Sequence, residues 1–105
     1  MRAASEILRD IAAFDPGADE SWLRLDELLA ELRAEGSPPV ESVDVLLGVL
    51  ERFPGSDGFG VLWSVVHGVE SLPHPYEEQL RASHRRVPSE MSAIMLSRLA
   101  NGVDR

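Results

Sequence analysis

The sequence contains no cysteine, so its 105 residues form no disulfide, offer no thiolate ligand for zinc and carry out no thiol chemistry. This absence is compatible with a reducing compartment, and we expect a cytoplasmic protein. Long apolar runs are missing as well. No stretch approaches the roughly 18 uninterrupted apolar residues of a membrane span, and the N-terminus lacks the apolar core of a signal peptide. The sequence therefore predicts neither a membrane-spanning helix nor a secreted precursor.

Positive charge is scarce. There are 18 acidic residues against 10 basic ones, all arginine, which gives a net charge of −8 at pH 7. An acidic surface repels the phosphates of nucleic acids and of anionic lipids. It attracts a basic protein at a rate that falls with added salt. We therefore expect a basic protein partner, no nucleic acid and no membrane.

The alternation typical of half-buried strands is also missing, apart from short valine-rich pieces that suit helices better. Apolar residues instead recur every three to four positions, and Pro or Gly interrupts the pattern at regular intervals. At this length the chain is one domain, residues 1–105. The sequence predicts an all-α fold with six helices, at about 3–14, 19–35, 38–53, 57–72, 75–87 and 88–101.

The helix expected at 57–72, with Ser56 or Asp57 as its cap, is apolar around most of its circumference. Such a helix belongs inside a protein, and we expect the other five to sheathe it. One narrow stripe is small or weakly polar, so that a neighbouring backbone or a ligand can approach it closely. It consists of Gly60, Ser64, His67, Gly68 and Ser71.

The connections between the expected helices are short, which makes neighbouring helices antiparallel. Successive helix pairs each span about 35 residues, the period of a helical-hairpin repeat. The pattern predicts three antiparallel hairpins, arranged as a HEAT-like short solenoid or as an irregular helical bundle. In a solenoid the second helix of each hairpin lines one concave face. The acidic residues of the second helix would then share a surface with the His67–Glu70 stretch of the fourth.

Four glutamates of the second helix lie within about 60° of one another at 100° per residue: Glu20, Glu27, Glu31 and Glu35. Only Arg24 interrupts this acidic stripe, so its repulsion is expected to remain largely unrelieved. A solvated face is the ordinary interpretation of such a stripe, and a surface that awaits a cationic partner is the alternative. We select the four glutamates, with His67 and Glu70, as candidate partner-binding residues.

His67 and Glu70 lie on one helical turn, which is half of a possible metal site. A di-iron bundle needs Glu-x-x-His twice with two further glutamates, whereas here the order is reversed and occurs once. A structural histidine or one that contacts a partner explains the pair better. The sequence has no phosphate-binding glycine loop and no Gly-x-Ser-x-Gly elbow. We predict no enzymatic activity, no cofactor and no metal.

The second half of the chain carries a further pattern of residue types. It runs Asp57-Gly58-x-Gly60-Val61-Leu62-Trp63-Ser64-x-x-His67-x-x-Glu70, then Tyr76-Glu77, Arg86-x-Pro88-Ser89-Glu90 and Met95-Leu96-x-Arg98-Leu99-x-Asn101. In this order the pattern resembles small all-helical bacterial immunity proteins, which accompany polymorphic or contact-dependent toxins. The resemblance covers about half of the chain. It implies a protein that binds a cognate toxin tightly and has no activity of its own, and it assigns no binding residue.

Three functions remain open from the sequence. The first is an immunity protein that neutralises a basic toxin domain, for instance a nuclease, by covering its active site with an acidic helical surface. The second is a helical-repeat adaptor of another pathway. The third is a small metal-dependent hydrolase built around His67 and Glu70. Whichever function holds, we expect a monomer or weak dimer.

Overall fold

The computed structural model describes residues 3–17, 22–34, 38–55 and 60–102, and its regular elements are all helical within these ranges. There are six α-helices in the described part: α1 (Ala4–Ala12), α2 (Leu23–Ala34), α3 (Glu41–Arg52), α4 (Val61–Ser71), α5 (Glu77–Arg86) and α6 (Glu90–Gly102). The predicted all-α class is confirmed. Among the described residues, none of these helices has the length and apolarity that a membrane crossing needs.

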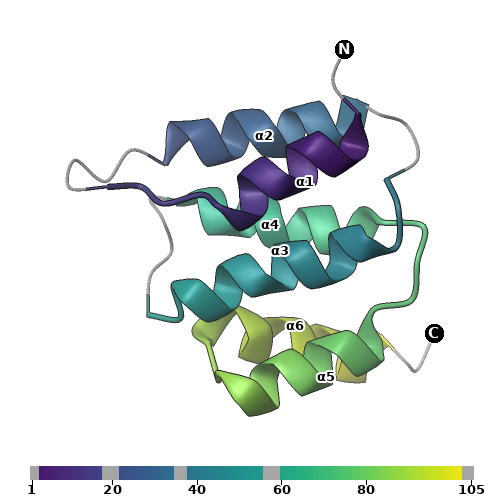
Figure 1. Ribbon diagram of the computed structural model, residues 1–105. Helices are drawn as coiled ribbons and strands as arrows, with labels where there is room; N and C mark the ends of the chain where they lie inside the picture. Colours follow the sequence, from purple (N-terminus) through teal and green to yellow (C-terminus); the bar gives the residue numbers. More distant parts are fainter. Residues whose placement is uncertain (1–2, 18–21, 35–37, 56–59, 103–105) are drawn as a thin grey trace.

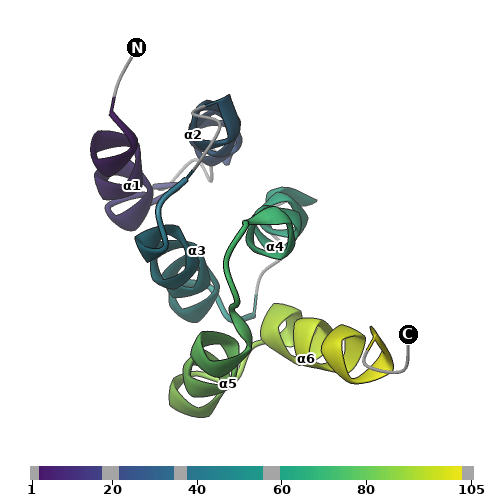
Figure 2. The ribbon, with the colours of Figure 1, turned by 90° about the vertical axis from the view of Figure 1, so that its right-hand side faces the viewer.

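The helices form three antiparallel hairpins that stack on one another (Figures 1 and 2). One row contains α1, α3 and α5, and the other contains α2, α4 and α6 (Figure 2). The two helices of each hairpin pack against each other. Helices also pack along each row: α3 contacts α1 and α5, and α4 contacts α2 and α6. This ladder is the stacked-hairpin arrangement, the first of the two architectures that the sequence allows.

The prediction that α4 is sheathed by the five other helices is wrong. It packs on α2, α3 and α6, and it buries only one side: Leu62, Val65, Val66 and Val69. Trp63 is half-buried and His67 is exposed. In a two-row stack a middle helix has neighbours on three sides and faces solvent on the fourth, whatever its composition. Its hairpin partner α3, which packs on α1, α4 and α5, buries more residues: Ser42, Val43, Leu46, Leu47, Val49 and Leu50.

Proline follows closely after α1, α3, α4 and α5, as the sequence predicts, whereas α6 continues through the Asn101 and Gly102 that were expected to close it. After α1 the chain turns at Gly17, whose φ of 74° is left-handed and whose N–H donates to Asp15 Oδ1 at 2.8 Å. The cap predicted at Ser56 or Asp57 lies outside the described residues. Within them, α4 follows Gly60 with a φ of 90°, a conformation that favours glycine.

An aromatic cluster joins the first hairpin to the end of α3. The Trp22 ring lies 5.6 Å from Phe14 and 5.0 Å from Phe53, centroid to centroid. Arg52 adds polar contacts by donating to the carbonyl oxygens of Ile11, at 2.9 Å, and Ala12. Carbonyls at the end of a helix lack the usual intrahelical partner, and here the Ile11 oxygen also accepts from the Phe14 N–H at 3.1 Å. Arg52 therefore caps α1 from the neighbouring helix.

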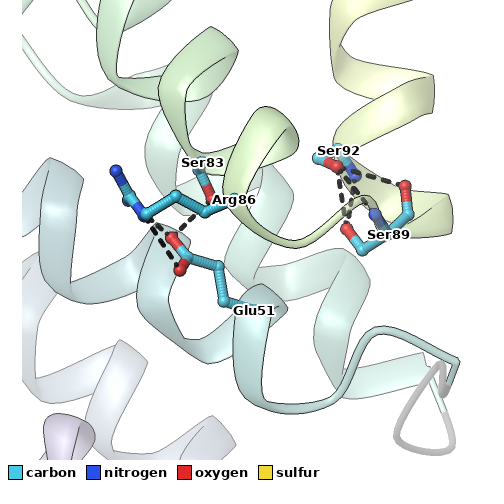
Figure 3. Close-up of polar contacts among 5 residues, drawn as sticks. All are labelled: Glu51, Ser83, Arg86, Ser89 and Ser92. Carbon is cyan, nitrogen blue, oxygen red and sulfur yellow. Dashed lines mark hydrogen bonds and ion pairs between the residues drawn. The ribbon is translucent and has the colours of Figure 1, made fainter.

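A second polar group attaches the third hairpin (Figure 3). The carboxylate of Glu51 in α3 accepts hydrogen bonds from Ser83 Oγ at 2.7 Å and from Arg86 at 2.8 and 3.3 Å. The Arg86 hydrogen bonds hold the pKa of Glu51 below its ordinary value, against the opposing effect of burial. We call these three residues the Glu51 latch.

The N-terminus of α6 is capped by two buried serines (Figure 3). Ser89 Oγ accepts from the Ser92 N–H at 3.0 Å, and Ser92 Oγ accepts from the Ser89 N–H at 3.2 Å. This reciprocal pair is the geometry of a capping box. His84 Nδ1 of α5 lies 2.6 Å from Ser92 Oγ, so the cap also joins the two helices of the hairpin.

Candidate functional site

The acidic stripe of α2 lies at the outer edge of the stack. Glu27 is exposed and Glu31 is partly exposed, with 56% and 39% of their side-chain surfaces open to solvent. Glu20 and Glu35, the other two candidates, lie outside the described residues. At 100° per residue, Glu27 lies almost opposite the buried leucines of α2, whereas Glu31 lies nearer to their side, and Arg24 links both glutamates to Asp10 of the neighbouring helix α1.

Arg24 relieves part of the repulsion expected within this stripe, because its guanidinium lies among the carboxylates. Its guanidinium is 3.6 Å from Glu27, 3.8 Å from Glu31 and 3.9 Å from Asp10 of α1. We call these four residues the Arg24 cluster. Three carboxylates and one guanidinium give the cluster a net charge of −2. Ion pairs that are this exposed to solvent are individually weak. Sequence reasoning missed Asp10 because a helical wheel for α2 contains no information about its neighbour.

His67 and Glu70 lie together on α4, as their spacing predicts, with Nδ1 3.8 Å from the carboxylate. The stronger partner of Glu70 is Arg98 of α6, at 2.8 Å. Sequence reasoning did not select Arg98 as a site residue. The Trp63 ring lies beside His67, with centroids 6.2 Å apart. Burial, followed by the charge of Glu70, raises the pKa of Tyr76 at the same edge.

This α4–α6 group does not favour a metal-dependent hydrolase. Glu70 is only 19% exposed and already contacts a guanidinium. Among the described residues there is no set of three or more His, Asp or Glu side chains arranged to hold a metal ion. The chemistry that this geometry supports is ion pairing at a helix–helix edge, with His67 left accessible for contact.

The two sets of candidate residues make their ion pairs with different neighbouring helices. The Arg24 cluster reaches across to α1, whereas Glu70 reaches across to α6. Because α2 packs on α4 and α4 packs on α6, the two groups occupy opposite flanks of the α2–α4 pair. The prediction that these residues share one surface stays a prediction, and between the two groups lies the junction of α2 with α4.

That junction contains a cavity of about 140 Å³. The small-residue stripe of α4 lines one wall through Ser64, Gly68 and Ser71, which places open space where the sequence suggests a close approach. Its remaining lining residues come from α2, α3 and two connections: Leu29, Leu32, Arg33, Pro38, Leu46, Leu72 and Pro73. We call this cavity the α2–α4 pocket.

Comparisons with known proteins add no functional information. No family model matches the chain, and no curated protein and no solved structure is significantly similar to it.

Proposed function

We propose that the protein is an immunity protein that binds a cognate toxin domain in the cytoplasm and blocks its active site, without catalysis of its own. The partner is a basic domain, and a nuclease fits this description because its substrate is a polyanion. The observation that carries the proposal is the charge distribution. The chain has a net charge of −8, and the exposed edge of α2 keeps excess negative charge even around Arg24. The resemblance of residues 51–101 to immunity proteins supports it further.

The acidic edge and the apolar surfaces have different roles in this mechanism. Exposed carboxylates such as Glu27 attract a basic domain and accelerate encounter, but each contributes little to the final affinity. Affinity comes instead from a few apolar anchors that are buried on binding. The stacked hairpins suit this role because their packed helices present both features on a preformed surface, which lowers the entropic cost of binding.

The first test is to find the partner. The protein is co-expressed with the product of the neighbouring gene, and the two are purified together while growth of the host is followed. We expect a stable complex and rescue from toxicity. Complex formation with an unrelated cellular protein, without any rescue, would contradict the immunity function and favour the adaptor.

The second test asks whether the carboxylates of the Arg24 cluster attract the toxin domain more than exposed carboxylates elsewhere on the protein do. Glu27→Gln with Glu31→Gln removes two charges from the Arg24 cluster, and Glu41→Gln with Glu78→Gln removes two exposed charges elsewhere. Stopped-flow association with the toxin domain should slow severalfold for the first pair at low salt, and the difference should shrink as salt is added. Equal rates for the two double variants would exclude the acidic edge of α2 from the interface.

A further inference from the structure

The α2–α4 pocket has the size of a single side chain. Its volume of about 140 Å³ compares with the engineered apolar cavity of about 150 Å³ that takes up benzene. Pockets for larger organic ligands measure roughly 300–1,000 Å³. Four leucines from three segments supply much of its wall: Leu29, Leu32, Leu46 and Leu72. The space therefore suits one leucine-sized group, with leucines on one part of its lining and Ser64, Ser71 and Arg33 on another.

Gly68 keeps this space open although nothing else in the described structure requires a glycine there. Its φ is not left-handed, and an added Cβ would lie 3.5 Å from Leu46 Cδ1, an ordinary van der Waals contact. A glycine inside a helix costs roughly 1 kcal/mol relative to alanine. An alanine at position 68 would instead reduce the volume of the pocket. Gly48 of α3 also tolerates an added Cβ, which would meet nothing within 4 Å, and it does not line the pocket, so it provides a control.

The rim of the pocket carries one positive charge. Arg33 is exposed, lines the pocket and makes no hydrogen bond or ion pair in the part of the chain that the structure describes. A guanidinium at this rim can form two parallel hydrogen bonds with a carboxylate. An occupant that places a carboxylate next to its apolar group would therefore match both features.

The walls of the pocket are fixed by a contact between two connections. His74 Nε2 donates a hydrogen bond to the carbonyl oxygen of Pro38 at 2.8 Å. Pro38 lies before α3, and Leu72 and Pro73 follow α4, and all three line the pocket. The hydrogen bond joins both sides, so the pocket exists before a partner arrives and binding does not have to create it.

We propose that the α2–α4 pocket anchors the protein partner: a leucine-sized side chain enters beside Gly68, and a neighbouring carboxylate of the partner pairs with Arg33. The inference rests on the proposed function for the identity of that partner, the toxin domain. It assigns the apolar anchor to a place outside both the Arg24 cluster and the Glu70–Arg98 pair. The partner is then basic overall but acidic where it meets Arg33.

The pocket can be tested without the toxin. The probe is N-acetyl-L-leucine, which carries a leucine side chain next to a carboxylate, and its neutral control is N-acetyl-L-leucinamide. We expect saturable NMR shifts at the backbone amides of Ser64, Gly68 and Leu72, with millimolar affinity for so small a ligand. The amide should bind severalfold more weakly. Absence of saturable shifts at these positions up to about 50 mM would overturn the proposal.

Variants provide the controls. Gly68→Ala should weaken the probe at least threefold, and Ser64→Leu, which fills more of the pocket, should abolish its saturable shifts. Gly48→Ala should leave probe binding unchanged. Arg33→Gln should lower the affinity for N-acetyl-L-leucine to that for N-acetyl-L-leucinamide. Thermal unfolding confirms that each variant is folded. Unchanged probe binding to both Gly68→Ala and Ser64→Leu would overturn the assignment.

Experiments with the toxin domain separate this inference from the proposed function. Gly68→Ala should raise the dissociation rate of the complex at least threefold relative to Gly48→Ala. If the toxin domain binds and dissociates equally from both variants, the anchor is wrong and the proposed function stands. If the probe binds at the pocket but the product of the neighbouring gene is neither bound nor neutralised, the proposed function is wrong. The pocket would still be a site for a leucine side chain beside a carboxylate.

Discussion

The Glu51 latch should make a measurable contribution to the free energy of unfolding. Two substitutions of Glu51 separate the part due to its charge from the part due to its hydrogen bond with Ser83. Glu51→Gln keeps an oxygen that can accept from Ser83 but removes the charge that Arg86 contacts. Glu51→Ala removes both and leaves the Ser83 hydroxyl, in a side chain that is 1% exposed, without its acceptor. The difference between the two variants therefore reports the buried hydroxyl.

The magnitudes follow from exposure. A buried polar group without a partner costs roughly 1–3 kcal/mol, so Glu51→Ala should lower the free energy of unfolding by about 2 kcal/mol. Arg86 is 60% exposed, so solvent screens its ion pair, and Glu51→Gln should cost at most about 1 kcal/mol. For a domain of this size about 1 kcal/mol corresponds to roughly 4–8 °C in Tm.

The charged part of this contribution depends on pH. The pKa of Glu51 is lowered in the folded protein, mainly by the hydrogen bonds from Arg86. A lowered carboxyl pKa stabilises the fold above the unfolded pKa, about 4.3 for Glu, and this stabilisation is lost as pH falls through the folded value. The gap between wild type and Glu51→Gln should therefore be constant near neutral pH and close below about pH 4.

Urea unfolding at several pH values, followed by tryptophan fluorescence, measures these differences. The isosteric Gln variant is the control for shape, and Glu41→Gln on the exposed first turn of the same helix is the control for charge. The reasoning is refuted if Glu51→Ala is as stable as wild type. It is also refuted if the gap for Glu51→Gln persists unchanged at pH 3.

Three further predictions concern packing and capping. Leu62→Ala removes a side chain that is 0% exposed, and it should cost about 2–5 kcal/mol in calorimetry or urea unfolding, whereas Leu23→Ala, at an exposed position, should cost less than about 1 kcal/mol. Arg52→Met keeps much of the apolar stem but uncaps the end of α1, so it should cost about 1 kcal/mol and accelerate amide exchange in that helix, while unchanged exchange would contradict the capping role. Ser92→Ala should cost roughly 1–2 kcal/mol because it breaks the reciprocal cap of α6, and equal stability to wild type would show that the cap contributes nothing.

The positions of the helices follow from local chemistry and were predictable from the sequence. Pro16, Pro54 and Pro88 lack the backbone N–H that a continuing helix needs, and the described helices end before each of them. The buried leucines and valines also lie at the predicted spacing, since that spacing needs only one helix at a time. For the same reason α4 could be recognised as apolar.

The arrangement of the helices depends on contacts between distant segments, which a single-helix pattern does not contain. The apolar content of α4 did not reveal that α6 covers only one of its edges and leaves His67 in solvent. The candidate residues show the same limit. Asp10 joins the Arg24 cluster and Arg98 contacts Glu70, and both belong to neighbouring helices that no spacing rule within α2 or α4 can identify.

The α2–α4 pocket lies between these two cases. Its small residues, Ser64, Gly68 and Ser71, form a visible stripe in the sequence. The facing wall, which includes Arg33 and Pro38, comes from segments about 30 residues earlier, and only the packed structure brings the two together. The sequence thus indicates that something can approach α4 closely, but not that the approach leaves an open space.

The ladder of hairpins has a consequence for how the protein acquires its shape. Every substantial helix contact joins helices that are neighbours or next neighbours along the chain. Folding therefore never requires remote ends to meet, and helical proteins dominated by such short-range closures fold in microseconds to milliseconds. During synthesis, the first hairpin can form while later residues are still being added, because its packing partner α3 is the next helix to leave the ribosome.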